Sequence, residues 1–572
     1  MSPASAPVAV RPGQELGPAR GHPDADQNDP NRGAIPAASA LGERRLNGRG
    51  LPKGGECNGE VQDRACGKPD SWAAAHGLRV WLRLRWRRGG RIRSGYCVEP
   101  PTGRSTQWQG RRVSSHKEGE LNYRLRSTVV HQARGGWHLF WDQETVAWTI
   151  TDQIGASALE SLRSPRTLNQ VAAEIATQTG YSVREVRPEV ARLIESAVGS
   201  GLIETDRGHC RAPDSVAGDG VPNPEFLYLH LTSRCNLRCS YCYASPGPNK
   251  ERERRDLPFA VAREVLRQAQ GLGVQNVVVT GGEPLLHPQA VQILEEAKRL
   301  GQGVNLLTNG LLIEPSLARR LAIACDQITI SLDSADPTLH DLHRGRGAHA
   351  RASRAIAILN EVGFPHVVVA AVLTRHNQHE RYEDFAAYAT SLGAERVSRQ
   401  VYILQGAHRD ETLRLDFDSF LACLAQELDA AVAQAQPRGE RPSAIWRDRC
   451  GAASGVVAIG ADGVVYPCQG LIRSEFAAGS IREDSLDEIY AHARVLKEVR
   501  AITVADIPGC SGCECRFLCG GGCRALAYNT SGCLSAPIPP EYCAFARLLA
   551  EWKLWGAALH QISLSAPAEL TL

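Results

Sequence analysis

The sequence has almost no methionine, since Met1 is the only one among 572 residues. It also lacks any run of about 18 uncharged apolar residues, which argues against a transmembrane helix. No charged segment followed by an apolar one begins the chain, so a signal peptide is not expected. Formal net charge is only +3. These absences predict a cytoplasmic protein with no membrane partner, and the near-neutral charge makes a nucleic-acid partner unlikely as well.

The first segment, residues 1–119, is rich in Gly, Pro and Arg and shows no sustained apolar periodicity. Disorder is the simplest interpretation, because too little apolar surface is available to offset the loss of chain entropy. Interleaved Trp and Arg in Leu78–Arg93 leave a nucleic-acid-binding or membrane-surface arm as an alternative. A third hypothesis follows from the lone methionine. Translation would then start at a non-AUG codon near Val113, Leu121 or Val129, and much of the segment would be absent from the native protein.

Cysteine is abundant and unevenly placed. The chain has 18 cysteines, and in a reducing compartment so many thiols more often hold metal than form disulfides. Three lie at Cys235, Cys239 and Cys242, and five fall between Cys510 and Cys523. Cys325 and Cys423 have no partner at ligand spacing, so both are expected to be small buried apolar residues.

Residues 120–207 predict a small winged-helix unit. Two strands around a turn at Asp142–Glu144 precede three amphipathic helices, with Thr167 as an N-cap and Gly180 and Gly201 as stops. The expected strands are His138–Phe140 and Val146–Thr151, and the expected helices are Gly155–Leu162, Leu168–Thr179 and Glu185–Ser200.

This unit resembles the peptide-recognition domain of ribosomally made peptide pathways, the fold of the pyrroloquinoline-quinone peptide chaperone. The resemblance covers Asn122–Asp206 and depends on the hairpin, on Thr167–Ile175 (T-x4-A-x2-I) and on the closing Gly201–Ile203. It implies that a leader peptide adds as an extra strand to the hairpin edge. A winged helix that binds DNA or a partner protein is the alternative.

After a linker at residues 208–224, strands and helices alternate through residues 225–440. Six β–α repeats predict a parallel sheet curled into a partial (β/α)6 barrel, whose chemistry lies in the loops after the strands. The expected strands are Phe226–Leu231, Asn276–Thr280, Val304–Leu307, Gln327–Leu332, Pro365–Leu373 and Val397–Leu404, and the clearest helices are Phe259–Leu272 and His287–Leu300.

Cys235-x3-Cys239-x2-Cys242 follows the first expected strand directly. Three thiolates on a four-iron cluster leave one iron open, whereas a structural zinc site requires a fourth ligand. With Tyr241 before the third cysteine, the motif resembles that of the radical S-adenosylmethionine (SAM) superfamily. The resemblance implies a [4Fe–4S] cluster that binds SAM and cleaves it to methionine and a 5′-deoxyadenosyl radical, which abstracts hydrogen from carbon.

The resemblance also implies residues that bind SAM, at the ends of successive strands. Each polar residue taken singly is equally compatible with a helix N-cap, and their joint placement favours the site. His343-Arg344-Gly345 matches a common motif, but no role is assigned to it. The implied residues are Tyr241, Gly281, Gly282, Glu283, Pro284, Asn309, Ser331 and Asp333.

Residues 441–550 resemble the SPASM extension of peptide-modifying radical enzymes, which holds auxiliary [4Fe–4S] clusters. Asp462-Gly463 predicts a hairpin turn that places Cys468 at a strand end. A zinc ribbon is the alternative for residues 510–523, and Cys515 and Cys533 are extra thiols that could replace a neighbour. The resemblance implies a first auxiliary set of Cys450, Cys468 and Cys523 and a second of Cys510, Cys513, Cys519 and Cys543.

Together these patterns predict a radical SAM enzyme that modifies a ribosomally made precursor peptide, with residues 551–572 as a C-terminal tail. Its expected partners are the precursor with its leader sequence and an electron donor such as flavodoxin or ferredoxin. Formation of a Cys thioether is the leading reaction. Carbon–carbon cross-linking and formylglycine-type sulfatase maturation are the alternatives. An alternative from a different functional class is an iron–sulfur protein that binds peptide or DNA and senses redox state. That alternative gives no role to the turn Gly281–Pro284 (GGEP).

Overall fold

The computed structural model describes residues 121–206, 222–242, 255–404, 410–437, 446–560 and 570–571. The chain forms two units, residues 1–109 and 110–572, and every described residue belongs to the second. The predictions for residues 1–119, for most of the linker at 208–224 and for the alternative start sites before Leu121 lie outside the described residues.

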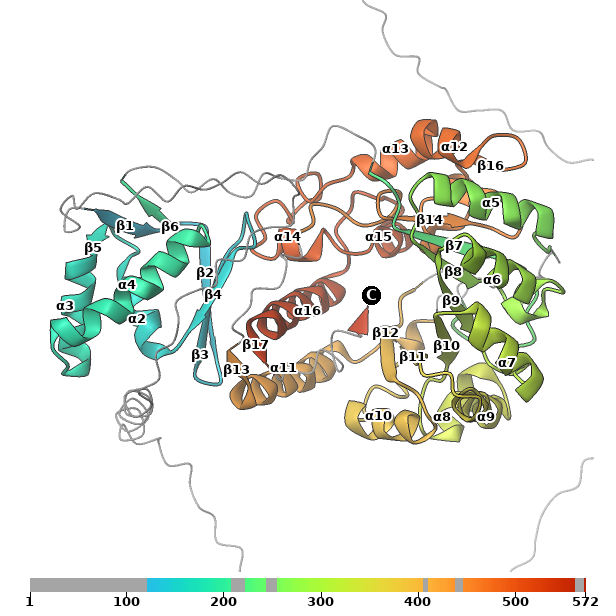
Figure 1. Cartoon of the computed structure of the whole chain (residues 1–572), viewed down its shortest axis with the longest axis horizontal. Coiled ribbons are helices and arrows are strands. Elements are labelled where there is room, and N and C mark those ends of the chain that lie inside the picture. Colours follow the sequence, from blue (N-terminus) through green and yellow to red (C-terminus); the bar gives the residue numbers. More distant parts are fainter. Residues whose placement is uncertain are drawn as a thin grey trace, which may run out of the picture. The chain divides into compact units, whose positions relative to one another are not determined.

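The segment from Asn122 to Thr205 contains three helices and two small antiparallel sheets, ordered β2-β3-β4 and β5-β1-β6 (Figure 1). The predicted hairpin is therefore one part of a three-stranded sheet, and the second sheet was not predicted. The elements are β1 (Asn122–Leu125), β2 (Val129–Arg134), β3 (Trp137–Asp142), β4 (Trp148–Thr151), α2 (Gln153–Ser161), β5 (Arg166–Thr167), α3 (Leu168–Thr179), α4 (Val183–Gly199) and β6 (Ile203–Thr205).

Helix α3 has the predicted bounds because its ends are specified locally. Thr167 and Gln170 form a reciprocal capping box at its start, and Gly180 adopts a left-handed conformation (φ +73°) at its end. Its buried face contributes Val171 and Ile175 to a separate hydrophobic core shared with α2, α4 and β3. This local core gives the segment the packing of a small domain.

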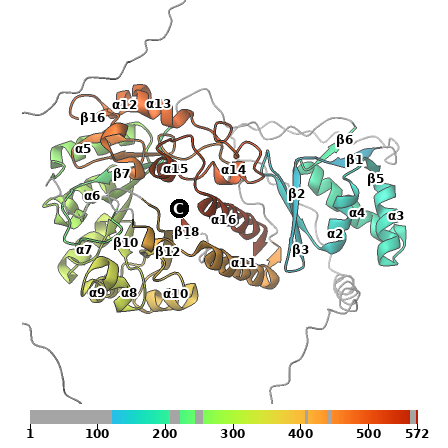
Figure 2. The ribbon, with the colours of Figure 1, turned by 180° about the vertical axis from the view of Figure 1, so that it is seen from behind.

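The next part is a parallel sheet in the order β7-β8-β9-β10-β11-β12, with helices along its outer face (Figures 1 and 2). The predicted α/β class and the strand sequence are confirmed. The strands are β7 (Phe226–His230), β8 (Asn276–Thr280), β9 (Gly303–Thr308), β10 (Gln327–Ser331), β11 (Val367–Leu373) and β12 (Arg396–Val401). The helices are α5 (Phe259–Gly271), α6 (Ala290–Arg299), α7 (Pro315–Ala324), α8 (Pro337–Arg344), α9 (Ala348–Glu361) and α10 (Tyr382–Ser391).

The predicted hairpin of the third module joins this sheet. Strands β14 (Val456–Ile459) and β15 (Val464–Tyr466) pair antiparallel, and β14 pairs parallel with β7, with Val456 opposite Phe226. Further strands at the two ends, β16 (Gly479–Ser480) and β18 (Leu570–Thr571), leave the described ten-stranded sheet open, as a partial barrel requires. The cysteine-rich module is therefore a continuation of the barrel sheet.

Helices α11 (Phe417–Gln434) and α16 (Pro540–Ala558) contact each other around a second hydrophobic core. The boundary predicted at residue 550 is wrong, because it divides α16, in which Trp552 and Trp555 are buried. Shorter helices α12 (Leu486–His492), α13 (Arg494–Ala501), α14 (Arg516–Cys519) and α15 (Arg524–Ser531) complete the module. No helix in the described ranges is long and apolar enough to span a membrane.

Candidate active site

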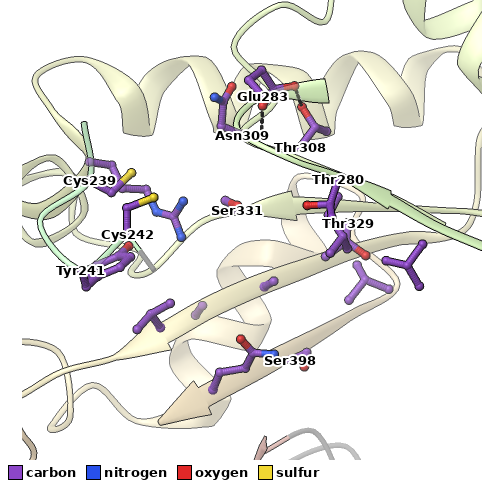
Figure 3. Close-up of a pocket in the computed structure, with 18 of the residues that line it drawn as sticks. Cys239, Tyr241, Cys242, Thr280, Glu283, Thr308, Asn309, Thr329, Ser331 and Ser398 are labelled. Atoms are coloured by element: carbon purple, nitrogen blue, oxygen red, sulfur yellow. Dashed lines mark hydrogen bonds between the residues drawn. The ribbon is translucent and has the colours of Figure 1, made fainter. Parts of the chain in front are cut away.

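A cavity of about 430 Å³ lies inside the partial barrel, at the strand ends (Figure 3). Cys235, Cys239 and Cys242 all line it, and they come from the loop that follows β7. The backbone N–H of Leu237 points at the Cys235 sulfur at 3.4 Å. Burial raises the pKa of the Cys239 thiol to about 11, so this thiol ionises at neutral pH only if a cation binds it.

The glycines of the GGEP turn approach the chain's own backbone. A Cβ on Gly282 would lie 2.1 Å from the Arg234 carbonyl oxygen, and one on Gly281, at φ +141°, would lie 2.5 Å from the Thr232 oxygen. The N–H groups of Gly282 and Glu283 donate to these same two oxygens, both at 2.7 Å. The turn after β8 is thereby fixed against the loop that leads to the cysteines.

Glu283 is a buried carboxylate that connects two strand ends (Figure 3). It accepts hydrogen bonds from the Thr308 hydroxyl at 2.6 Å and from the Asn309 backbone at 2.8 Å. Burial raises its pKa, and these hydrogen bonds oppose that rise. The Asn309 side-chain amide then donates to Asn236 Oδ1, inside the cysteine motif, at 2.7 Å. The ends of β8 and β9 are therefore joined to the cysteine loop after β7 by one hydrogen-bond network.

Asp333 holds two residues of the cavity wall in place. Its carboxylate pairs with the Arg344 guanidinium at 2.6 and 2.9 Å, and it also accepts from the Tyr241 hydroxyl and from the Val372 N–H. Burial acts to raise the pKa of Asp333, but Arg344 outweighs it and the pKa is lowered. The carboxylate is ionised, and all of its acceptor directions point at protein groups.

The cavity brings together most of the predicted cofactor residues, with two departures. Asp333 and Pro284 do not line it: Asp333 is occupied by the pairs above, and Pro284 is buried in the first turn of a short helix, η1 (Pro284–Leu286). Arg344, at the end of α8, does line the cavity, although the sequence assigned it no role. The predicted residues that line it are Cys235, Cys239, Tyr241, Cys242, Gly281, Gly282, Glu283, Asn309 and Ser331.

The first predicted auxiliary set is close together in space. Burial raises the pKa of Cys468, and the thiols of Cys450 and Cys523 raise it further. The same proximity holds between Cys523 and Cys450. Cys468 follows strand β15, and Cys523 lies at the N-terminus of α15, so distant parts of the sequence supply the three sulfurs.

The second predicted set is also assembled. Burial raises the pKa of Cys519 to about 11, and Cys543, Cys510 and Cys513 add to it. The two extra thiols, Cys515 and Cys533, have different surroundings from each other. Cys515 is buried near Cys513 and several charged side chains, and Cys533 is exposed next to Ser535.

The two isolated thiols of the barrel and of α11 differ in burial. Cys325 is buried as expected, whereas Cys423 is exposed on α11, so the prediction for Cys423 is wrong. Its neighbour is Glu427, and one helical turn of α11 separates the two residues.

The three sulfur sets suit iron–sulfur clusters rather than single ions. In the described ranges no three His, Cys, Asp or Glu side chains converge closely enough to hold one metal ion. A cubane cluster does not need that convergence, because each thiolate binds a different iron. Three groups of soft thiolate donors, one of them at the cavity wall, fit this kind of cofactor.

An open parallel sheet with three cysteines at its strand ends and a cysteine-rich extension defines a class of iron–sulfur enzymes. Comparison with known families agrees with this. Residues 229–389 match the model "Radical SAM superfamily", and residues 450–514 match the "Iron-sulfur cluster-binding domain" named SPASM. The chain belongs to the radical SAM superfamily and carries a SPASM domain. Members of this class use a [4Fe–4S] cluster and SAM, with further clusters in the SPASM domain.

Three curated proteins illustrate the relatives. A mycofactocin maturase from Mycobacterium ulcerans is 30% identical over 56% of this chain and 88% of its own length. An AdoMet-dependent heme synthase from Methanosarcina barkeri is 28% identical over 54% of this chain and 93% of its own. A PqqA peptide cyclase from Xanthomonas axonopodis is 30% identical over 54% of this chain and 86% of its own.

Proposed function

We propose that this enzyme modifies a ribosomally made precursor peptide, working in the cytoplasm with a small electron-transfer protein as reductant. The observation that carries the proposal is the joining of a radical SAM cavity to a separate small domain that presents an open sheet edge. Two of the relatives named above are a peptide cyclase and a maturase. A heme synthase is also related, and the peptide experiments below distinguish a peptide substrate from a small-molecule one.

The chain's own residues have three tasks in this reaction. A [4Fe–4S] cluster with SAM supplies a carbon-centred radical that takes hydrogen from an unactivated carbon. Cys235, Cys239 and Cys242 would hold the cluster at the cavity wall. The Gly282 turn and Ser331 offer polar contacts to SAM, and Arg344, oriented by Asp333, presents a fixed positive charge to an anionic group such as a carboxylate.

The leader peptide would add to strand β4, one edge of the β2-β3-β4 sheet. At the other edge, Arg134 of β2 is ion-paired with Asp429 and Glu551. The N–H of Asp142, the last residue of β3, donates to the oxygen of Ala147, just before β4. Because hydrogen-bonded and non-hydrogen-bonded pairs alternate along an antiparallel pair, Ile150 opposite Leu139 is a non-hydrogen-bonded position, and its N–H points outward. An extended peptide would pair with such outward groups by β-augmentation.

Replacing Ile150 with proline should weaken leader binding at least tenfold. Proline removes the outward N–H of the edge strand but leaves the inward ladder bonds of β4 intact. Titration calorimetry of the full chain with the leader peptide measures the affinity.

The matched control is Ile150→Val, which keeps the N–H and shortens the side chain. This variant should bind the leader within about twofold of the parent, since only one methylene is lost. Equal affinity of all three proteins would show that β4 is not the docking edge. Thermal melting of each protein checks that the sheet remains folded.

Thioether formation is the reaction that the first auxiliary set favours. Cys450, Cys468 and Cys523 supply three thiolates, and the buried Cys515 lies beside Cys513 of the other set. An iron without a protein ligand accepts a soft thiolate, and a substrate cysteine would be that ligand. Carbon–carbon cross-linking and formylglycine formation require no such contact.

A core peptide that contains cysteine should change the electron paramagnetic resonance (EPR) signal of the first auxiliary cluster. Its Cys→Ala version should leave the signal as it is without peptide, because no thiolate reaches the iron. Both peptides keep the same leader, so they bind the enzyme equally. Identical spectra with the two peptides, or turnover of the cysteine-free peptide, would contradict thioether chemistry at this site.

A further inference from the structure

Arg524 is a fully buried cation without a carboxylate partner. Its side chain is one of the largest among those that are less than 2% exposed. The guanidinium donates to the backbone oxygens of Leu534 at 2.9 Å and Ala536 at 2.8 Å, and also to that of Gly521. Among the described residues, no Asp or Glu lies within ion-pairing distance of Arg524, whereas the largely buried Arg344 does have such a partner.

Arg524 adjoins both auxiliary sets. It directly follows Cys523 of the first set, and its guanidinium donates to the oxygens of Gly521 and Gly522, in the short segment that joins Cys523 to Cys519 of the second set. Burial lowers the pKa of Arg524, and Cys450, Cys510, Cys523 and Cys519 act in the opposite direction. Two of these four cysteines belong to the first set and two to the second. Arg524 is therefore a cation within electrostatic reach of both sets at once.

A buried cation is costly unless negative charge compensates it. Backbone oxygens satisfy the N–H groups of Arg524 but carry no net charge. A four-iron core bound by three or four thiolates does carry net negative charge, so two such clusters would supply the missing compensation. The position of Arg524 is thus explained once both sets are loaded.

We propose that Arg524 is a shared tuning residue that raises the reduction potentials of both auxiliary clusters. Reduction adds one electron to a cluster and makes it more negative, and a fixed positive charge in a buried site stabilises that product. One residue would therefore make both clusters easier to reduce. The proposal depends on the assignment of the two sulfur sets to clusters, and iron analysis tests that assignment separately.

The experiment is an EPR-monitored redox titration of the reconstituted full chain. Cys235, Cys239 and Cys242 are replaced by Ala in every sample so that only the auxiliary clusters contribute to the signal. In this background Arg524→Gln should lower both potentials by at least about 59 mV, a tenfold change in a one-electron equilibrium. Arg524→Lys keeps the charge, so both of its potentials should differ from the parental values by less than half of the shift expected for Arg524→Gln.

The matched control is Arg547→Gln. Arg547 also acts on a cluster sulfur, that of Cys543, but it is half-exposed and already paired with Glu514 at 2.6 Å. Its removal should shift neither potential by more than a third of the Arg524→Gln effect, because solvent and Glu514 screen its charge.

Iron and sulfide analysis of each variant separates tuning from cluster loss. Loss of iron in Arg524→Gln together with full iron and near-parental potentials in Arg524→Lys would still support the role of the charge. Unchanged potentials in Arg524→Gln, a shift of one cluster alone, or equal shifts in the Lys and Gln variants would overturn the proposal. Failure of the parent to bind auxiliary iron would instead refute the cluster assignment.

Discussion

The triple replacement of Cys235, Cys239 and Cys242 by Ala should abolish cleavage of SAM. All three line the cavity and no other cysteine does, so no replacement ligand is available within the described residues. The variant should release no 5′-deoxyadenosine above the enzyme-free background. Its iron content should fall by one four-iron cluster, because the auxiliary sulfurs lie on other elements.

Two further samples make this result interpretable. Cys423→Ala removes an exposed thiol on α11 and should leave iron content and cleavage unchanged. Circular dichroism should show that the triple variant is folded, since its core residues are intact. Release of 5′-deoxyadenosine by the triple variant would mean that the catalytic cluster is bound elsewhere.

Replacing Asp333 with Asn should lower stability and weaken SAM binding together. Asn keeps the size of the side chain but leaves the buried Arg344 without a counter-ion, and breaking such a pair costs about 3–5 kcal/mol. Arg344 and Tyr241 would lose their orientation at the cavity wall. We expect SAM affinity to fall at least tenfold by calorimetry, along with a lower unfolding midpoint in guanidinium.

A double variant tests the cause. Asp333→Asn with Arg344→Met removes both charges and should regain part of the lost stability, although not the SAM affinity. Asp336→Asn is the control, because this N-cap of α8 hydrogen-bonds Thr338 and Asn caps a helix equally well. If the double variant is no more stable than Asp333→Asn, the ion pair is not the reason for the loss.

The parts of the fold that the sequence predicted are those with local signals. β8 and α3 have the predicted bounds because a run of valines and a capping box specify them without help from distant residues. β14 and β15 follow from the Asp462-Gly463 turn, but their pairing with β7 was not predicted. That contact joins residues more than two hundred positions apart, and no local pattern encodes it.

In the candidate active site, too, the residues with a local sequence signal were predicted, and those placed only by the fold were not. The spacing of Cys235, Cys239 and Cys242 identifies a metal-binding motif by itself, and the cavity contains all three. Arg344 was not assigned because a single Arg at a helix end has many uses, and only the fold places it at the cavity wall. Asp333 was expected to contact SAM, but its partners come from three other elements that the sequence does not bring together.

The glycine pair shows a different limit of sequence reasoning. Gly281 and Gly282 were expected to bind SAM. The structure shows that the backbone of Thr232 and Arg234 already occupies the space that a Cβ would need. A side chain at either position would therefore displace the cysteine loop itself.

The most direct test of this account is the amount of 5′-deoxyadenosine that the reconstituted full chain makes from SAM with and without its precursor peptide. Liquid chromatography after reduction with dithionite measures it. We predict slow release without peptide and at least tenfold faster release with a leader-bearing precursor, accompanied by a mass change of the peptide. A fully iron-loaded protein that releases no 5′-deoxyadenosine, or releases it at the same rate with no change in peptide mass, would contradict the account.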